Sequence, residues 1–480
     1  MPKPHYNHTI FILTGPSFSK YAFSKLCFAL SALETATAHL VHRDAPYKKG
    51  QHTLNLLDGT VCPSYNEKQW TGTVDVSDEH RLFFWAFESR HDPANDPVIV
   101  FLGGGPGQSG LGYAIQEGGS CRLSKSTGND PIPNPWAWNN NATVVYLDQP
   151  ATVGFSSSTT GRNIFFRDIF PQKAHLPVNI AGRSYGAHYA AAYARYIVDA
   201  RRDNSTEAFT GDLASLVLLN PILDWGAIIG STYEFYCVNK ITEGIFSREE
   251  CEAMLAPSAK LEKMALRCES TLLPADCKDM YKYGDENVLS YIFSHKDLNQ
   301  YYIGNLCEGA STCNDRDSGN KTEYFNRASV KKALGVPASR EWIEFNQDIE
   351  SACSNSSTMY ISRKADLAAA LDGYQTLHDG NPLANTRILV ISGNNGGLFT
   401  TEASDLTLQR TIWTRMVDYR STKWHSFTKA DLAVDGEFKA TRDGRLALVA
   451  MDNTGHSPAK DQPEGTYRVL QRWLEDGFHS

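Results

Sequence analysis

The sequence has no apolar run of about 18 residues or more, the length from which a membrane-spanning helix is predicted. We therefore expect no membrane span in the mature chain. It also lacks an excess of positive charge, because 46 Lys and Arg residues are outnumbered by 54 Asp and Glu residues and the net charge is −8. Binding to a phosphate backbone requires a concentrated positive field, so a nucleic-acid partner is not expected.

Internal repeats and low-complexity tracts are missing as well, and 36 Gly and 21 Pro residues are an ordinary share of 480. With 41% hydrophobic residues, this composition excludes disorder, collagen and coiled coil as the main state. The length permits about two to four domains, or one α/β domain with insertions. The sequence leaves the oligomeric state open.

Residues 1–38 are typical of a signal peptide. Lys20 and Lys25 precede a short apolar segment at 26–33, and the small residues Ala36 and Ala38 follow with the spacing of a cleavage site. A buried core helix is the alternative interpretation of the apolar segment.

Nine cysteines follow residue 38, and six of them lie between 237 and 313 without the CxxC or His spacing of zinc sites. This crowding favours disulfides formed in an oxidising compartment, and no metal site is expected. Four Asn-x-Ser/Thr sequences are candidate glycosylation sites, at Asn141, Asn204, Asn320 and Asn355. Together these signals predict the secretory pathway, with an extracellular or a vacuolar or lysosomal destination.

Short apolar or alternating runs predict seven strands, at 82–87, 98–102, 143–147, 178–181, 216–219, 388–391 and 446–451. Helical patterns at 187–200 and 466–474 favour βαβ units and a mostly parallel sheet. Between 230 and 350 the pattern changes to polar, cysteine-rich helical segments, which we interpret as a cap or insertion. The core of this α/β fold is then expected at 39–229 and 351–480.

Ser184 lies at the centre of a nucleophile elbow. The strand at 178–181 runs into Gly182-Arg183-Ser184-Tyr185-Gly186, and a helical pattern follows. Such a strained strand-to-helix turn needs small flanking residues because strand and helix approach closely. His456, in a loop after the last predicted strand and before the final helix, is the candidate general base.

Here the chain resembles the serine carboxypeptidase family. The motifs that carry the resemblance stand in the family's order over roughly residues 60 to 475, at 83–89, 96–99, 103–107, 134–139, 147–150, 153–156, 182–189, 219–221, 455–456 and 461–463. The resemblance implies an α/β-hydrolase fold and release of C-terminal amino acids from peptides or proteins through an acyl-enzyme. It implies no cofactor and no metal.

The same resemblance implies the roles of the catalytic groups. Ser184 looks like the nucleophile and His456 like the base that takes its proton and returns it to the leaving amine. The backbone N–H groups of Gly105 and Tyr185 match the oxyanion hole. A phosphate-binding loop at 103–107 is disfavoured, because no Lys-Ser/Thr follows the glycines.

The third triad position departs from the family. The family's aspartate follows a strand, and here Gly396 occupies its place. Asn395 or Asp405 could substitute, although an amide does not stabilise an imidazolium as a carboxylate does. In serine proteases this loss costs about 10⁴ in kcat, so an inactive or weakly active member that binds peptides or protects a partner is an alternative. An esterase or acyltransferase on the same fold is another.

The site for the substrate carboxylate also departs. Gly104 and Glu117 match the family, but Arg183 stands where the family has a Glu and Gly103 where it has an Asn. Arg183 stays charged at any relevant pH and could bind the substrate carboxylate, which predicts a flatter pH profile. Alternatively, an Arg183–Glu117 ion pair closes the pocket.

Disulfides follow from spacing and from the resemblance, which pair Cys237 with Cys251, Cys268 with Cys277 and Cys307 with Cys313. Cys353 is then expected to pair with Cys62 or Cys121. The segment from 155 to 170 is too short for the family's crossover helix, so one face of the sheet is expected to be bare unless another segment covers it.

Overall fold

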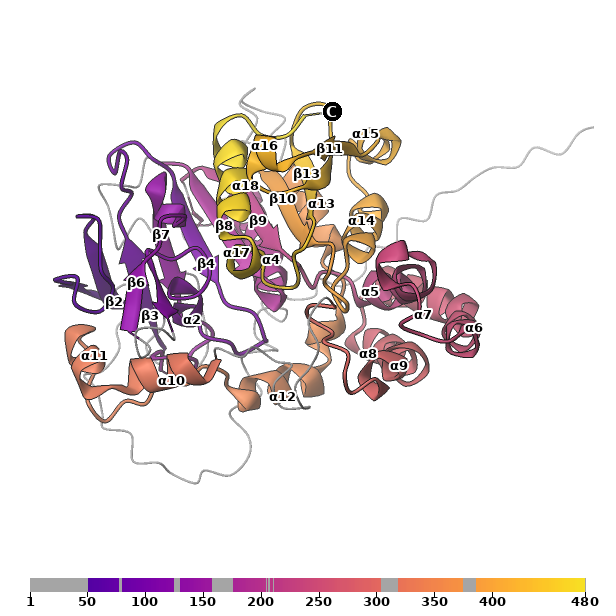
Figure 1. Cartoon of the computed structure of the whole chain (residues 1–480), viewed down its shortest axis with the longest axis horizontal. Helices are drawn as coiled ribbons and strands as arrows, with labels where there is room; N and C mark the ends of the chain where they lie inside the picture. The colour runs from indigo at the N-terminus through magenta and orange to yellow at the C-terminus, as the bar shows by residue number, and fades with distance from the viewer. Residues whose placement is uncertain are drawn as a thin grey trace, which may run out of the picture.

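Figure 1 shows the fold in a computed structural model. The structure describes residues 51–76, 80–124, 130–157, 176–203, 205, 208–209, 211–303, 318–373 and 386–479. The signal peptide, most of the short crossover, Asn204, Cys307 and Cys313 lie outside the described residues, as does the side chain of Asn320.

The centre of the molecule is a mixed sheet in which six neighbouring strands run parallel, in the order β7-β4-β8-β9-β10-β13. Antiparallel strands flank them, β1, β2 and β3 beside β7, and β12 and β11 beside β13. The strands are β1 (His52–Leu56), β2 (Gln69–Asp75), β3 (Arg81–Phe87), β4 (Val98–Leu102), β7 (Thr143–Leu147), β8 (Val178–Arg183), β9 (Leu213–Leu219), β10 (Arg387–Gly393), β11 (His425–Phe427), β12 (Gly436–Ala440) and β13 (Leu446–Met451). A separate hairpin pairs β5 (Cys121–Ser124) with β6 (Asp130–Pro133).

All seven strands expected from the sequence are present, because their continuous apolar runs are buried on both faces. Every residue of β7 and of β13 is buried, as is usual for a parallel strand covered by helices. The outer strands β1, β2, β11 and β12 were not predicted. β1 is almost wholly exposed, so it lacks the apolar run by which a strand is recognised.

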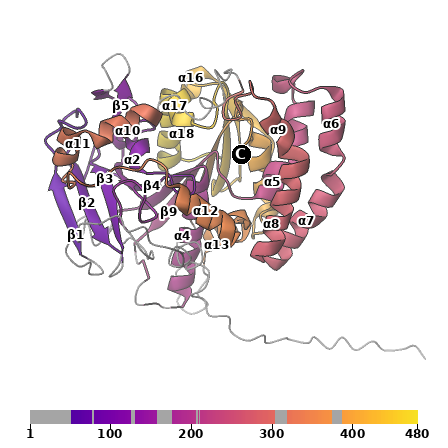
Figure 2. The same cartoon turned by 90° about the horizontal axis from the view of Figure 1, so that it is seen from below.

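Helices cover both faces of the sheet (Figures 1 and 2). One face packs with α4 (Tyr185–Arg202), α13 (Lys364–Asp372) and α14 (Thr401–Arg410). The other face packs with α2 (Leu111–Ala114), α10 (Ser318–Asn326), α11 (Ala328–Ala333), α16 (Lys429–Leu432), α17 (Pro458–Asp461) and α18 (Pro463–Glu475). The first face is not bare over β3 and β7, because Phe84, Val145 and Leu147 are all buried there.

Helices from the central part of the sequence form a group to one side of the sheet in both views. They are α5 (Trp225–Gly230), α6 (Arg248–Leu255), α7 (Ser258–Thr271), α8 (Pro274–Gly284) and α9 (Ser290–Ser294). α12 (Gln347–Ser356) and α15 (Met416–Ser421) lie elsewhere, and short helical turns are η3 (Trp138–Asn140), η5 (Glu234–Val238), η6 (Lys240–Thr242), η7 (Asp285–Leu289) and η8 (Thr358–Tyr360). This arrangement agrees with the expected α/β-hydrolase core with a helical insertion.

Two of the expected disulfides are confirmed, Cys237–Cys251 and Cys268–Cys277. The expected bridge from Cys353 is wrong, because Cys62 is bonded to Cys121. Their Cα atoms lie 5.6 Å apart although 59 positions separate them in the chain. Sequence spacing identifies disulfide partners that are close together in the chain, but not partners that the fold brings together from distant positions.

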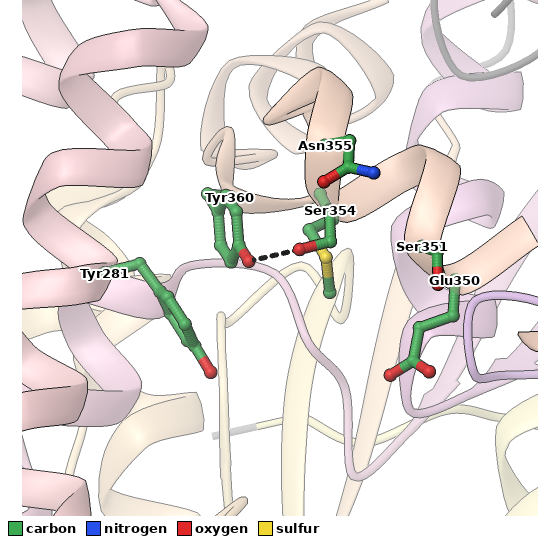
Figure 3. Close-up of a pocket in the computed structure, with 7 residues that line it drawn as sticks. Tyr281, Glu350, Ser351, Ser354, Asn355 and Tyr360 are labelled. Carbon is green, nitrogen blue, oxygen red and sulfur yellow. Dashed lines mark hydrogen bonds between the residues drawn. The ribbon is translucent and has the colours of Figure 1, made fainter.

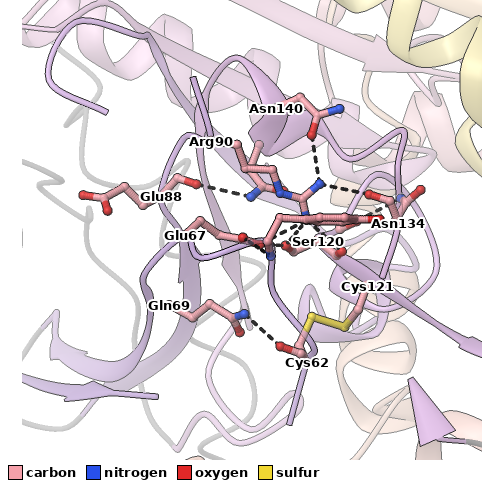
Figure 4. Close-up of polar contacts among 12 residues, drawn as sticks. Cys62, Glu67, Gln69, Glu88, Arg90, Ser120, Cys121, Asn134 and Asn140 are labelled. Carbon is pink, nitrogen blue, oxygen red and sulfur yellow. Dashed lines mark hydrogen bonds and ion pairs between the residues drawn. A yellow bond between two sulfur atoms is a disulfide. The ribbon is translucent and has the colours of Figure 1, made fainter. Parts of the chain in front are cut away.

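Arg90 anchors the region around this third disulfide (Figure 4). Its guanidinium donates to Glu67 (3.0 Å), to the Ser120 hydroxyl (2.6 Å) and to Asn140 (2.8 Å). Burial would raise the pKa of Glu67, but hydrogen bonds from Ser120 and Arg90 lower it below its ordinary value. The cluster thus holds an ionised carboxylate and fixes the segment that carries Glu117, three residues before Ser120.

Candidate active site

The nucleophile elbow is built by steric necessity. β8 ends at Arg183, Ser184 has φ 57° and ψ −124°, and α4 starts at Tyr185. A Cβ atom at Gly182 would overlap the backbone of Gly186, and one at Gly186 would overlap the carbonyl oxygen of Leu102. Only glycines allow β8, α4 and β4 to approach this closely, so the backbone itself holds Ser184 at the carboxyl end of the sheet.

The glycine-rich loop after β4 lies against Ser184. A Cβ atom at Gly104 would lie 3.1 Å from the Cβ atom of Ser184 and 2.9 Å from the carbonyl oxygen of Arg183. The next residue, Gly105, has φ +101°, which side-chain-bearing residues rarely adopt. The loop therefore brings bare backbone next to the hydroxyl, as an oxyanion hole requires.

His456 follows β13, and its loop is fastened to the elbow. Asn220, directly after β9, donates from Nδ2 to the carbonyl of Gly455 (2.8 Å), and the N–H of Ser184 donates to Leu219 (2.9 Å). Arg183 donates from Nη1 to the hydroxyl of Ser457. The neighbours of Ser184 are thus hydrogen-bonded to the neighbours of His456, and the two catalytic candidates are 8% and 7% exposed.

Position 396, where the sequence predicts the third triad residue, contains no side chain. Gly396, after β10, donates its N–H to Gly393 (3.0 Å), and a Cβ atom there would lie 3.1 Å from the carbonyl oxygen of Phe399 and 3.9 Å from the carbonyl carbon of Gly455. The position therefore adjoins the His456 loop. A Cβ atom would fit after shifts of a few tenths of an ångström.

The two suggested substitutes for the carboxylate differ in their surroundings. The backbone N–H of Asn395 donates to Thr454 (2.8 Å), which joins its loop to the His456 loop, and its side chain is half-buried. Asp405 lies on α14, where its carboxylate accepts from Lys439 (3.0 Å), from the Tyr419 hydroxyl (2.9 Å) and from Gln409 (2.7 Å). The Asp405 carboxylate is thus hydrogen-bonded to Lys439, Tyr419 and Gln409.

Arg183 and Glu117 form an ion pair beside Gly104, in accord with the alternative drawn from the sequence. The guanidinium also lies over the ring of Tyr113, 4.7 Å from its centroid. Burial raises the pKa of the Tyr113 phenol to about 12, although Arg183 acts in the opposite direction. The Tyr113 hydroxyl therefore stays protonated and donates to Gln108 (2.5 Å).

Two aromatic rings that the sequence analysis did not single out contact the imidazole. The His456 ring centroid lies 4.8 Å from that of Phe399 and 5.3 Å from that of Tyr301. Tyr301 belongs to the segment 300–303, whose backbone pairs with both loops. All three bonds run from a backbone N–H to a backbone carbonyl: from His456 to Tyr301 (2.8 Å), from Leu398 to Gln300 (2.9 Å) and from Ile303 to Asn395 (2.9 Å).

A cavity of about 380 Å³ lies between α8, α12 and η8. Figure 3 shows its lining, in which Tyr360 and Ser354 are hydrogen-bonded (2.9 Å). Ring contacts connect this cavity to the base: Phe399 meets Trp225 (6.2 Å), Trp225 meets Tyr281 (4.8 Å), and Tyr281 stacks on Tyr360 (4.4 Å). The cavity and the catalytic loops thus share one aromatic wall.

Other expectations concern the surface. Asn355, at the end of α12, is exposed, whereas Asn141 is half-buried and accepts a hydrogen bond from Tyr467 (2.5 Å). Within the described ranges no helix is long and apolar enough to cross a bilayer. No group of His, Cys, Asp and Glu among the described residues has the arrangement of a metal site.

The fold and the elbow define an α/β hydrolase: a mostly parallel sheet that carries a serine on a strand-to-helix turn and a histidine after a later strand. The family model described as serine carboxypeptidase matches residues 60–476, and the chain belongs to this family.

Similar proteins agree with this assignment. A protein named carboxypeptidase Y homolog A from Fusarium vanettenii is 30% identical over 433 residues, which cover 85% of this chain and 74% of that one. Carboxypeptidase Y from Komagataella phaffii is 28% identical over 439 residues, covering 86% and 76%. The crystal structure of Kex1(delta)p, a prohormone-processing carboxypeptidase from Saccharomyces cerevisiae, superposes with a TM-score of 0.67 at 18% identity, over 88% and 93% of the two chains. The chain is accordingly a serine carboxypeptidase-type hydrolase.

Proposed function

We propose that this protein releases C-terminal amino acids from peptides or proteins through an acyl-enzyme on Ser184. His456 takes the Ser184 proton as the hydroxyl attacks the scissile carbonyl, and it returns that proton to the leaving amine. Water then attacks the ester with His456 again as base, and the acyl group leaves as a carboxylic acid. The hydrogen bonds that join the two flanking segments support this pairing.

The oxyanion is stabilised in this proposal by the N–H groups of Gly105 and Tyr185. Gly104 brings the glycine loop against Ser184, and Tyr185 is the first residue of α4, where the helix dipole is positive. One such donor is worth about 10² to 10³ in kcat in serine hydrolases.

Arg183, Glu117 and Gly104 receive the substrate carboxylate in this proposal. The guanidinium carries several N–H donors, and the ion pair with Glu117 fixes its plane beside the glycine loop. A carboxylate that joins this pair adds one charge-assisted contact without requiring a proton. Recognition of the C-terminus is then nearly independent of pH.

The single observation that carries the proposal is the strained conformation of Ser184 at the end of β8, beside bare backbone of the glycine loop. A non-Gly residue at positive φ costs free energy, of the order of 1–3 kcal/mol, and such strain is concentrated at functional sites. Because Gly396 supplies no carboxylate, we expect the turnover to be slow rather than absent.

A fluorophosphonate probe tests this function. We expect wild-type protein to be labelled at Ser184, and the Ser184→Ala and His456→Ala variants to be unlabelled. Cleavage of a blocked dipeptide, but not of its C-terminal amide, then identifies a carboxypeptidase. Cleavage of a simple ester alone identifies an esterase on the same fold.

A peptide-binding protein without turnover is the second candidate, and Gly396 together with the Arg183–Glu117 ion pair favours it. In that case the probe leaves Ser184 unmodified while a peptide with a free C-terminus still binds. Loss of binding in Arg183→Ala would then locate the peptide.

The three described disulfides support the proposal that the chain matures in the secretory pathway, because such bonds persist in oxidising compartments. We further propose that residues 39–229 and 351–480 form the catalytic unit and that 230–350 form its cap. Peptide mapping after glycosidase treatment tests the compartment through Asn355, the exposed candidate acceptor.

A further inference from the structure

The imidazole of His456 lies in a corner formed by two other rings. Its centroid is 4.8 Å from Phe399 and 5.3 Å from Tyr301, with interplanar angles of 36° and 40°. Phe399 and Tyr301 are themselves 6.5 Å apart. The three centroids therefore form a triangle rather than a sandwich, so the two rings restrict the imidazole from two different directions.

Both rings are held firmly. Phe399 is 6% exposed, sits between β10 and α14, and packs against Trp225. The backbone of Tyr301 accepts from His456 and donates to the side chain of Asn299 (3.0 Å). Tyr301 is half-buried and packs against the main hydrophobic core.

Glycines permit this approach. A Cβ atom at Gly455 would overlap the ring of Tyr302, and one at Gly397 would come within 2.8 Å of the Cγ2 atom of Ile303. The segment 300–303 can therefore lie against both loops only because positions 397 and 455 lack side chains. The same segment is hydrogen-bonded to the backbone of Asn395 and of Leu398, on either side of position 396.

We propose that Phe399 and Tyr301 are positioning residues that orient the His456 imidazole in place of the absent carboxylate at 396. This inference rests on the proposed function of His456 as the base. A triad carboxylate fixes the ring plane through a hydrogen bond, whereas two close-packed rings fix it by excluding other rotamers. The faces of aromatic rings also attract cations, so they favour the imidazolium formed during the reaction.

Kinetics of Phe399→Leu test the proposal. Removing one wall lets the imidazole turn away from Ser184, and small misplacements of reacting groups cost up to about 10² in rate. We expect kcat and the labelling rate by fluorophosphonate to fall about tenfold or more, with KM unchanged, and Phe399→Tyr to retain most of the rate. Phe427→Leu, the same change at an equally buried position on β11, is the matched control and should leave kcat unchanged.

A second readout does not depend on turnover. Proton resonances of the His456 ring should be shifted by the ring currents of Phe399 and Tyr301. We expect this shift to decrease in Phe399→Leu and in Tyr301→Leu, and to persist in Phe427→Leu. If either Leu variant fails to fold, the other one decides the outcome.

The two readouts separate the two hypotheses. Absence of Ser184 labelling in folded wild-type protein overturns the proposed function, and the resonances still report whether the rings hold the imidazole. Wild-type kcat together with wild-type His456 resonances in both Leu variants overturns the positioning role. A loss that Phe399→Tyr shares equally with Phe399→Leu overturns it too, because an intact ring should rescue the rate.

Discussion

The two halves of the site are built differently. On the nucleophile side, close backbone contacts fix β8, Ser184 and α4. Glycine is the only residue type that fits at positions 182 and 186. On the base side, the His456 loop is held by other parts of the chain, through the side chains of Asn220 and Arg183 and through the backbone and ring of Tyr301. The local Gly-x-Ser-x-Gly pattern marks the first half in the sequence, whereas Gly396 leaves the second half without a carboxylate at the position where one is expected.

This contrast indicates which parts of such a site can change. A steric requirement admits no substitute, because any side chain at Gly186 collides with β4. A requirement for orientation can be met in several ways, by a carboxylate, by a loop tether or by packed rings. The base half can therefore diverge while the fold and the elbow remain.

The largest effect is expected from restoring the carboxylate. Gly396 has no positive φ, and the three atoms nearest to its Cβ position are the carbonyl oxygens of Phe399 and Gly393, at 3.1 and 3.3 Å, and the carbonyl carbon of Gly455, at 3.9 Å. Gly396→Asp should raise kcat by about 10² to 10⁴, since a triad carboxylate is worth about 10⁴ where it has been removed. Steady-state kinetics on a blocked dipeptide measures this gain.

Gly396→Asn is the matched control, because it has the same shape without the charge. It should leave kcat within about threefold of wild type, since an amide neither fixes the tautomer nor stabilises the imidazolium. Equal gains from Asp and Asn would show that the added side chain acts by packing. If neither variant increases kcat, the missing side chain at position 396 is not a cause of slow turnover.

A single added methyl group at position 186 should disrupt the nucleophile half. Gly186→Ala should abolish labelling of Ser184 by the fluorophosphonate, because the new Cβ atom overlaps the carbonyl oxygen of Leu102 and pushes α4 away from β4. Overpacking of this kind costs about 1–3 kcal/mol or more of stability. Urea unfolding measures that loss.

Gly230→Ala is the control for a generic cost of removing glycine from a helix, since nothing lies within 4 Å of the added Cβ atom. This variant should be labelled normally and be as stable as wild type or slightly more stable. Normal labelling of Gly186→Ala would contradict the claim that backbone contact sets the elbow.

The sequence predicts the nucleophile half far better than the base half. Continuous apolar runs identify β7 and β13, an alternating run identifies β8, and the local Gly-x-Ser-x-Gly pattern identifies the turn after β8. Tyr301 and Phe399 meet His456 only because a segment of the insertion docks between two loops, which no local pattern reveals. Gly397 and Gly455, which make room for that segment, were the available signal.

The Cys62–Cys121 bridge was missed for a related reason. β2 and β3 and the Arg90 cluster bring these cysteines together, and neither cysteine lies in a repeated spacing. A strand that is buried on both faces can be predicted from a local run of apolar residues, whereas contacts between distant segments depend on the whole fold. Edge strands such as β1 were missed because exposure removes the apolar run.

A smaller effect is expected from the charge at position 183. Because Arg183 remains protonated, KM of the wild type should vary little between about pH 5 and 8. In Arg183→Glu, the new carboxylate would face Glu117, and two adjacent carboxylates share a proton that they lose as the pH rises. KM of this variant should then rise, approaching tenfold per pH unit above the pKa of the pair.

Arg183→Gln separates loss of the cation from gain of an acid. It should weaken binding by a similar factor at every pH, since it introduces no titratable group. A steep increase of the wild-type KM above about pH 6 would falsify the role of Arg183, because a permanently charged group cannot produce one.

The smallest effect concerns the stability of the nucleophile half itself. His188, on the first turn of α4, is 1% exposed and stacks on Tyr185 at 4.3 Å. Burial, with a contribution from the positive charge of Arg363, holds the pKa of His188 well below its ordinary value of 6.5. The folded protein therefore keeps this imidazole neutral, whereas the unfolded chain takes up a proton below about pH 6.5.

The unfolded state then binds more protons than the folded state, so the free energy of unfolding falls as the pH decreases below about 6.5, by up to about 1.4 kcal/mol per pH unit. His188→Gln removes this pH-dependent contribution and lowers the free energy of unfolding by a constant amount because the stacking on Tyr185 is lost. Its deficit relative to wild type should shrink between pH 7 and pH 5 in urea titrations. A deficit of His188→Gln that stays constant would contradict the lowered pKa of His188 in the folded protein.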